Sequence, residues 1–128
     1  MKTILVDAIH AFVIDSKSIF KEMYDLLEVF PNQKIILTGA NNEQMEKFGL
    51  NNMPYPVFTL KHNPEKSDPE YYKTMLKKFN LTADDVVYFE HAKEAVDSAV
   101  LVGIKTYFYD SGKQDLESLK EFLTESLK

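Results

Sequence analysis

Three polar side chains stand directly after apolar segments of this sequence, and a lysine stands between two of them. They are Asp7, Thr38 and Glu90, with Lys66 between the last two. A carboxylate can attack phosphorus and form an acyl phosphate, while a hydroxyl and an ammonium can hold the non-bridging oxygens of a phosphoryl group. Two acids with a backbone carbonyl can hold Mg²⁺, which prefers oxygen ligands. These residue types therefore suit phosphoryl chemistry if the fold brings them together.

Each of the four side chains has a plainer interpretation when it is taken alone. Asp7 could cap a turn, and a Thr-Gly pair such as Thr38-Gly39 ends many strands. Lys66 could be a solvated lysine, and Glu90 could be an acid that the dipole of a following helix stabilises. The four side chains can form one site only if the strands and helices of the fold place them close together.

The pattern of the sequence predicts such elements, namely the strands and helices of a parallel α/β fold. Segments rich in β-branched and aromatic residues predict strands at residues 3–6, 34–37, 86–89 and 105–109, with residues 57–60 as a weaker candidate. Apolar residues at helical spacing predict helices at residues 16–30, 41–48, 68–79, 92–102 and 114–127. Alternating strands and helices indicate a parallel sheet, and such sheets bind ligands at the carboxyl ends of their strands. We expect the last helix to pack on the sheet, with a dimer interface as the alternative.

The overall composition narrows the class of protein. A chain of 128 residues suits one domain, residues 1–128, with a real core. Its formal net charge of -5 argues against nucleic acid or an anionic membrane surface as the partner. Without cysteine, thiolate catalysis and thiolate metal sites are excluded. No apolar run is long enough for a membrane span or a signal peptide, so we expect a cytoplasmic protein.

Four segments follow the order and spacing of a known set of motifs. They read Asp-Ala-Ile-His-Ala-Phe-Val at residues 7–13, Ile-Ile-Leu-Thr-Gly at residues 35–39, Lys-Ser-Asp-Pro-Glu-Tyr-Tyr at residues 66–72, and Val-Val-Tyr-Phe-Glu-His at residues 86–91. This pattern resembles the haloacid dehalogenase-like (HAD) phosphohydrolases over most of the chain. The resemblance implies a three-layer α/β/α, Rossmann-like fold with a parallel five-stranded sheet in the order 3-2-1-4-5. The short spacings between the motifs leave no room for a cap domain.

The resemblance also implies roles for particular residues. Asp7 would be the nucleophile and a ligand of Mg²⁺, and Thr38 and Lys66 would bind the transferring phosphoryl group. Glu90 would be a second metal ligand, and Ile9 would offer its backbone carbonyl to the same ion. The implied reaction is Mg²⁺-dependent hydrolysis of a phosphate ester through an aspartyl-phosphate.

Several positions depart from the HAD motifs. Ile9 replaces the acid that protonates the leaving group, a function typically worth ~10²–10⁴-fold in rate. His10 and Ala11 replace the Gly and Thr that follow, and His91 replaces the second acid of the last motif. Either His10 or His91 has taken over proton transfer, for which imidazole is well suited, or the site no longer turns over substrate. His62 is interpreted as a loop residue, and the spacing of the three histidines argues against a zinc site.

Two functions of different classes remain open. The first is an enzyme, a HAD-like phosphohydrolase acting on a phosphorylated small molecule. The second is a pseudoenzyme that uses the same scaffold to bind a phosphorylated ligand or a protein partner. Asp7, Thr38, Lys66 and Glu90 favour the enzyme, whereas the departures described above favour the pseudoenzyme.

Overall fold

The computed structural model describes residues 1–128 and contains a five-stranded sheet in which every neighbouring pair of strands is parallel. In spatial order the strands are β5 (Val57–Thr59), β4 (Lys34–Thr38), β1 (Thr3–Asp7), β6 (Val86–Glu90) and β7 (Lys105–Phe108). Numbered along the chain, this is the order 3-2-1-4-5, so the predicted topology is confirmed.

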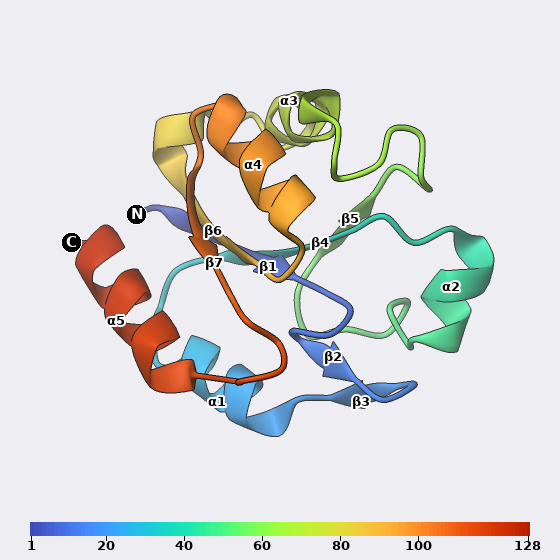
Figure 1. The fold of residues 1–128 in the computed structure, drawn as a ribbon, viewed down its shortest axis with the longest axis horizontal. Helices are drawn as coiled ribbons and strands as arrows, with labels where there is room; N and C mark the ends of the chain where they lie inside the picture. The colour runs from blue at the N-terminus through green and yellow to red at the C-terminus, as the bar shows by residue number, and fades with distance from the viewer.

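Helices cover both faces of this sheet (Figure 1). They are α1 (Lys21–Glu28), α2 (Asn42–Lys47), α3 (Pro69–Lys78), α4 (Lys93–Leu101) and α5 (Leu116–Ser126), with a short 3₁₀ turn at Ala83–Asp85. The pair α1 and α5 lies on one face and the pair α3 and α4 on the other, whereas α2 lies beyond the carboxyl end of β4. None of these helices combines the length and apolar character needed to cross a bilayer.

The three central strands are buried throughout, and their side chains alternate between two apolar cores. In β1, Ile4 and Val6 belong to the core under α1 and α5, while Leu5 belongs to the core under α3 and α4. In β6, Phe89 faces the first core and Tyr88 the second. Since side chains alternate along a strand, the residues that end β1 and β6 both fall on the α3 and α4 face.

The predicted helix at residues 16–30 is wrong in its first third. The chain instead forms a short hairpin of β2 (Val13–Ile14) and β3 (Ser18–Ile19), and α1 starts only at Lys21. The backbone N–H of Phe20 donates to the carbonyl of Phe12 at 2.8 Å, which ties the end of the hairpin to the loop after β1. The apolar residues just before α1 also pack against the core, although they are not helical. Their spacing continues that of α1, so the sequence pattern did not separate the hairpin from the helix.

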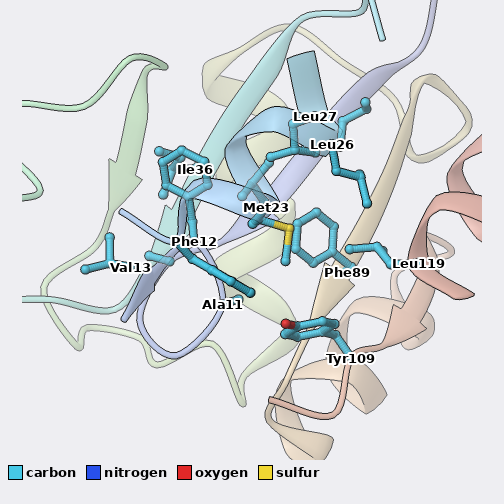
Figure 2. Packing of buried hydrophobic residues seen from close by; sticks show 14 of the residues in the cluster. Ala11, Phe12, Val13, Met23, Leu26, Leu27, Ile36, Phe89, Tyr109 and Leu119 are labelled. Atoms are coloured by element: carbon cyan, nitrogen blue, oxygen red, sulfur yellow. The ribbon is translucent and has the colours of Figure 1, made fainter. Parts of the chain in front are cut away.

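The last helix packs as predicted. Leu119 and Leu123 of α5 are fully buried in the same core as Phe89. Figure 2 shows Leu119 beside Phe89, with Met23 of α1 on the other side of that ring. Strand β7 ends one residue earlier than predicted, and the following Tyr109 is buried with its ring edge-to-face on Phe89.

Candidate active site

Lys66 bridges two buried carboxylates at the carboxyl edge of the sheet. Its Nζ lies 2.8 Å from Oδ1 of Asp7 and 2.7 Å from Oε1 of Glu90, and it also donates to the carbonyl of Leu37 at 3.2 Å. Both carboxylate side chains are 1% exposed, and the Lys66 side chain is 14% exposed. The interpretation of Lys66 as a solvated lysine is therefore wrong. Three residues far apart in the sequence form one ion-paired cluster.

The parallel register explains why the two acids meet. Val6 of β1 pairs with Phe89 of β6, so the next residues, Asp7 and Glu90, are neighbours at the ends of adjacent strands. The loop that carries Lys66 is held to α4 by a 2.6 Å hydrogen bond from Oγ of Ser98 to the carbonyl of Ser67. This contact fixes the lysine over the gap between the two strands.

His91 belongs to the same cluster. Its backbone N–H donates to Oδ2 of Asp7 at 3.0 Å, and its ring Nδ1 contacts the same oxygen. The ring nitrogen also lies 3.3 Å from Oε2 of Glu90. Because Lys66 takes Oδ1, both oxygens of Asp7 are engaged by basic side chains.

These contacts shift the proton affinities of all four groups. Burial, together with the nearby Glu90 charge, raises the pKa of Asp7 above its ordinary value. Burial is the largest influence on Glu90 and opposes its ionisation, but the Lys66 ammonium and the hydrogen bonds with neighbouring side chains, His91 among them, together outweigh burial and hold the pKa of Glu90 well below its ordinary value. Burial disfavours the ammonium of Lys66, yet the two carboxylates raise its pKa. Hydrogen bonds to Asp7 and then Glu90 raise the pKa of His91 to about 10.

The two oxygens of Glu90 have different partners, and one of these contacts agrees with the interpretation of Glu90 as an acid at the start of a helix. Its Oε1 contacts Lys66 and accepts a short hydrogen bond from the Tyr88 hydroxyl. Its Oε2 accepts from the backbone N–H of Ala92, the residue that precedes α4, at 3.0 Å. Tyr88 was not singled out by the sequence, although a tyrosine two residues before an acid in a strand must share that acid's face.

Thr38 is buried at the end of β4, 2% exposed, and lines the same cavity as the cluster. Its Oγ1 accepts from the backbone N–H of Ala40 at 3.2 Å. The hydroxyl of Tyr71 in α3 donates to the Thr38 carbonyl at 2.7 Å. These bonds fix the position of the threonine at the cavity.

A cavity of about 270 Å³ opens above the cluster. Beyond the expected residues, its wall includes Gln44, His62 and Glu65. Nε2 of His62 lies 2.5 Å from Oε1 of Gln44, and its Nδ1 lies 2.7 Å from Oε1 of Glu65. His62 is a loop residue, as interpreted, but it also forms part of the cavity wall. Gln44 was not identified from the sequence as a residue of the cavity. The one signal available for it is its spacing from Asn41, which is that of a capping box and indicates an ordered helix start.

The loop after β1 contains the remaining departures from the motifs. Ile9 lines the cavity with a half-buried side chain, and Ala11 is fully buried. His10 is exposed and has a positive φ of 74°. Its ring stands edge-on to that of His91, with centroids 5.3 Å apart. Of the two histidines, His91 contacts the carboxylates directly.

The cluster could hold a metal ion. Asp7, Glu90 and His91 each offer a ligand atom, and these atoms lie within 4.8 Å of one another. The two carboxylates suit Mg²⁺, which takes oxygen ligands in a near-octahedral arrangement. The imidazole nitrogen does not suit Mg²⁺, and in this respect the donor set departs from an all-oxygen site.

Comparison with known proteins identifies the fold. No protein-family model and no curated protein matches the sequence. Among solved structures, a HAD family enzyme from Bacteroides thetaiotaomicron, an Asp-to-Ala mutant in complex with magnesium and inorganic phosphate, is 12% identical, with a TM-score of 0.71 over 88% of this chain and 95% of that chain. An uncharacterized protein from Corynebacterium glutamicum is 18% identical, with a TM-score of 0.68 over 98% and 95% of the two chains.

A third solved structure agrees with these two. The core domain of a candidate phosphoglycolate phosphatase from Streptococcus pneumoniae is 16% identical, with a TM-score of 0.60 over 96% of this chain and 95% of that chain. At such identities the likeness establishes the fold rather than the activity. The chain has the HAD-like fold, a parallel five-stranded sheet between helical layers, with no cap domain inserted among its strands.

Proposed function

We propose that this chain binds the phosphoryl group of a phosphorylated ligand at the carboxyl edge of the sheet and hydrolyses the phosphate ester through Asp7. The observation that carries this proposal is the position of Lys66, which lies 2.8 Å from Asp7 at the base of a cavity that Thr38 also lines. A carboxylate nucleophile, an ammonium and a hydroxyl are thereby gathered around one space large enough for a phosphate. The HAD-like fold supports this class of reaction by analogy.

In the proposed reaction, an oxygen of Asp7 attacks phosphorus, and the bond between phosphorus and the ester oxygen breaks. The products of this step are an aspartyl-phosphate and an alcohol. Lys66 and Thr38 offer donors to the non-bridging oxygens, where negative charge accumulates. Water then attacks the aspartyl-phosphate, releasing inorganic phosphate and restoring the Asp7 carboxylate.

The leaving alcohol needs a proton, and Ile9 has none to give. We propose His91 as the substitute acid and base, because its ring lies at the cavity and already contacts Asp7. His10 is the second candidate, since its ring packs against that of His91. Of the two, His91 is favoured by its direct contact with the nucleophile.

Mg²⁺ is the cofactor that the HAD-like motifs imply. Asp7, Glu90 and the backbone carbonyl of Ile9 would be its oxygen ligands, and a bound ion would polarise phosphoryl oxygens. The imidazole of His91 is the part of the donor set that does not match this ion.

A second candidate function is binding without hydrolysis. Two observations favour it: Ile9 lines the cavity where an acid is needed, and both oxygens of Asp7 are already engaged by Lys66 and His91. A pseudoenzyme of this kind would recognise a phosphorylated small molecule or a phosphorylated protein partner through Lys66 and Thr38.

The two candidates are separated by measuring phosphate release and ligand binding on the same protein. Release is measured over a broad panel of phosphomonoesters with added divalent cations, and binding of inorganic phosphate is measured by calorimetry. For the first function, Asp7→Asn lowers kcat by at least ~10³-fold, because the nucleophile is lost. Asp25→Asn, on an exposed carboxylate of α1, is the matched control and leaves release unchanged.

Each outcome has a defined meaning. Phosphate binding without release from any ester would contradict hydrolysis and support the pseudoenzyme. Equal release by the wild type and Asp7→Asn would show that the activity does not come from this site. If the protein shows no phosphate binding and no phosphate release, both candidates are contradicted.

A further inference from the structure

The buried cluster divides its carboxylate oxygens between two basic side chains. Lys66 contacts Oδ1 of Asp7 and Oε1 of Glu90, at 2.8 and 2.7 Å. The ring nitrogen Nδ1 of His91 faces the other two oxygens, Oδ2 of Asp7 and Oε2 of Glu90. Three ligand atoms therefore lie together on the side of the cluster away from the ammonium, namely two carboxylate oxygens and one imidazole nitrogen.

The backbone holds the imidazole in this place. The N–H of His91 donates to Asp7 at 3.0 Å, and the N–H of Ala92 donates to Glu90 at 3.0 Å. Both bonds tie the junction between β6 and α4 to the two carboxylates. The imidazole is thus presented to the carboxylates by a fixed turn, and the three donors form a preorganised set.

This mixture of donors does not match the chemistry of Mg²⁺. That ion binds oxygen ligands and retains several waters, whereas imidazole nitrogen favours divalent ions of the first transition row. Affinity for a given nitrogen and oxygen site rises along that row from Mn²⁺ through Co²⁺. The chain contains no cysteine, so thiolates offer no competing site for such ions.

We propose that Asp7, Glu90 and His91 form a site for a divalent transition-metal ion of the Mn²⁺ and Co²⁺ class, with His91 as the nitrogen ligand and with Mg²⁺ disfavoured. The inference rests on the proposed function for the place of the site, but its test needs no substrate. Binding through Nδ1 releases the proton held there, so in the metal-bound form His10, the second candidate, would be the acid of the proposed reaction instead of His91. Lys66 keeps its own pair of oxygens, so the ion does not have to displace the ammonium.

The deciding experiment measures ion binding to the whole, substrate-free chain at pH 8 by titration calorimetry, with Mg²⁺, Mn²⁺ and Co²⁺ as the probes. We expect the wild type to bind Mn²⁺ and Co²⁺ at least ~10-fold more tightly than Mg²⁺. His91→Asp replaces the nitrogen with oxygen, and it should reduce this ratio by ~10-fold or more. His62→Ala, a cavity histidine outside the cluster, is the matched control and keeps the wild-type ratio.

A second measurement protects the test against a variant that fails to fold. Mn²⁺ added to the wild type should broaden the ring resonances of His91 at lower ion concentrations than those of His62. Equal affinities for Mg²⁺ and Mn²⁺, the same ratio in the wild type and His91→Asp, or broadening of His62 first would overturn the inference. Selective Mn²⁺ binding without phosphate release would support it while contradicting hydrolysis, so the two failures are distinguishable.

Discussion

Two lysines with largely buried side chains lie at opposite ends of the same sheet, and their surroundings differ in kind. Lys66 lies at the carboxyl edge, 14% exposed, between two buried carboxylates at 2.8 and 2.7 Å. Lys34 begins β4 at the amino edge and is 7% exposed. Its nearest carboxylate, Glu28, is 4.0 Å away, and its other contacts are the Phe30 carbonyl and the face of the Tyr55 ring.

The pKa values of the two lysines shift in opposite directions. Burial lowers the pKa of Lys34, and the half-exposed Glu28 only partly offsets it. Burial acts in the same sense on Lys66, but Asp7 and Glu90 outweigh it and raise its pKa. A buried lysine is therefore not evidence of a reactive site by itself. The convergence of carboxylates around the ammonium is what distinguishes the carboxyl edge.

Cavity size would point to the wrong end of the molecule. The cavity beside Lys34, lined by Tyr55 and Phe79 among others, measures about 420 Å³, whereas the one above Lys66 measures about 270 Å³. We favour the smaller cavity because Asp7, Glu90 and Thr38 line it together with Lys66, whereas no acidic residue lines the larger one. The comparison of the two lysines can be tested directly.

The largest expected effect follows from replacing each lysine with methionine. Lys66→Met leaves Asp7 and Glu90 buried without their shared ammonium, which should lower the free energy of unfolding by about 3–5 kcal/mol. Lys34→Met removes a lysine whose carboxylate partner is half-exposed, and the change should stay within about 1 kcal/mol. Urea unfolding at neutral pH in the presence of a chelator measures both values. Equal losses in the two variants would mean that burial, rather than the carboxylates, distinguishes the lysines.

The next largest effect concerns two tyrosines, one at each end of the sheet, whose hydroxyls each donate a hydrogen bond to a glutamate. The Tyr88 hydroxyl donates to the buried Glu90, and the Tyr55 hydroxyl donates to the half-exposed Glu28 at 2.6 Å. Tyr88→Phe should cost about 1.5–3 kcal/mol, because a buried charged acceptor loses its donor. Tyr55→Phe should cost about 0.5–1 kcal/mol, because water can replace the hydroxyl. The same unfolding measurement decides, and a larger loss in Tyr55→Phe would reverse the ranking of the two ends.

Much of the fold could be predicted because the central strands are continuous apolar runs, which indicate burial on both faces. The hairpin at residues 13–19 could not, because its strands are two residues long and its apolar side chains fit the spacing of the following helix. Parallel strands place their carboxyl ends at one edge of the sheet. The proximity of Asp7 and Glu90 could therefore also be predicted from the sequence.

The detailed contacts of the site were not predictable. Which oxygen Lys66 contacts depends on the loop before α3, and whether the ring of His91 turns back to Asp7 depends on the turn between β6 and α4. Neither follows from a periodic pattern. Gln44 and His62 lie on a six-residue helix and a loop, where spacing carries little information about direction. The sequence therefore predicted that the site lies at the carboxyl edge of the sheet, whereas the residues of the cavity wall depend on how the loops pack.

The smallest expected effect is a change of stability with pH at Lys34. Because the folded state lowers the pKa of Lys34, it disfavours the ammonium, and this penalty is fully present at pH values below the folded pKa. The penalty is relieved as pH rises from the folded pKa toward the ordinary value of 10.5. The free energy of unfolding of the wild type should thus rise relative to Lys34→Met between pH 8 and pH 10.5. A constant or falling difference would mean that Glu28 compensates the burial of Lys34 in full, and the contrast between the two lysines would then be one of degree rather than of sign.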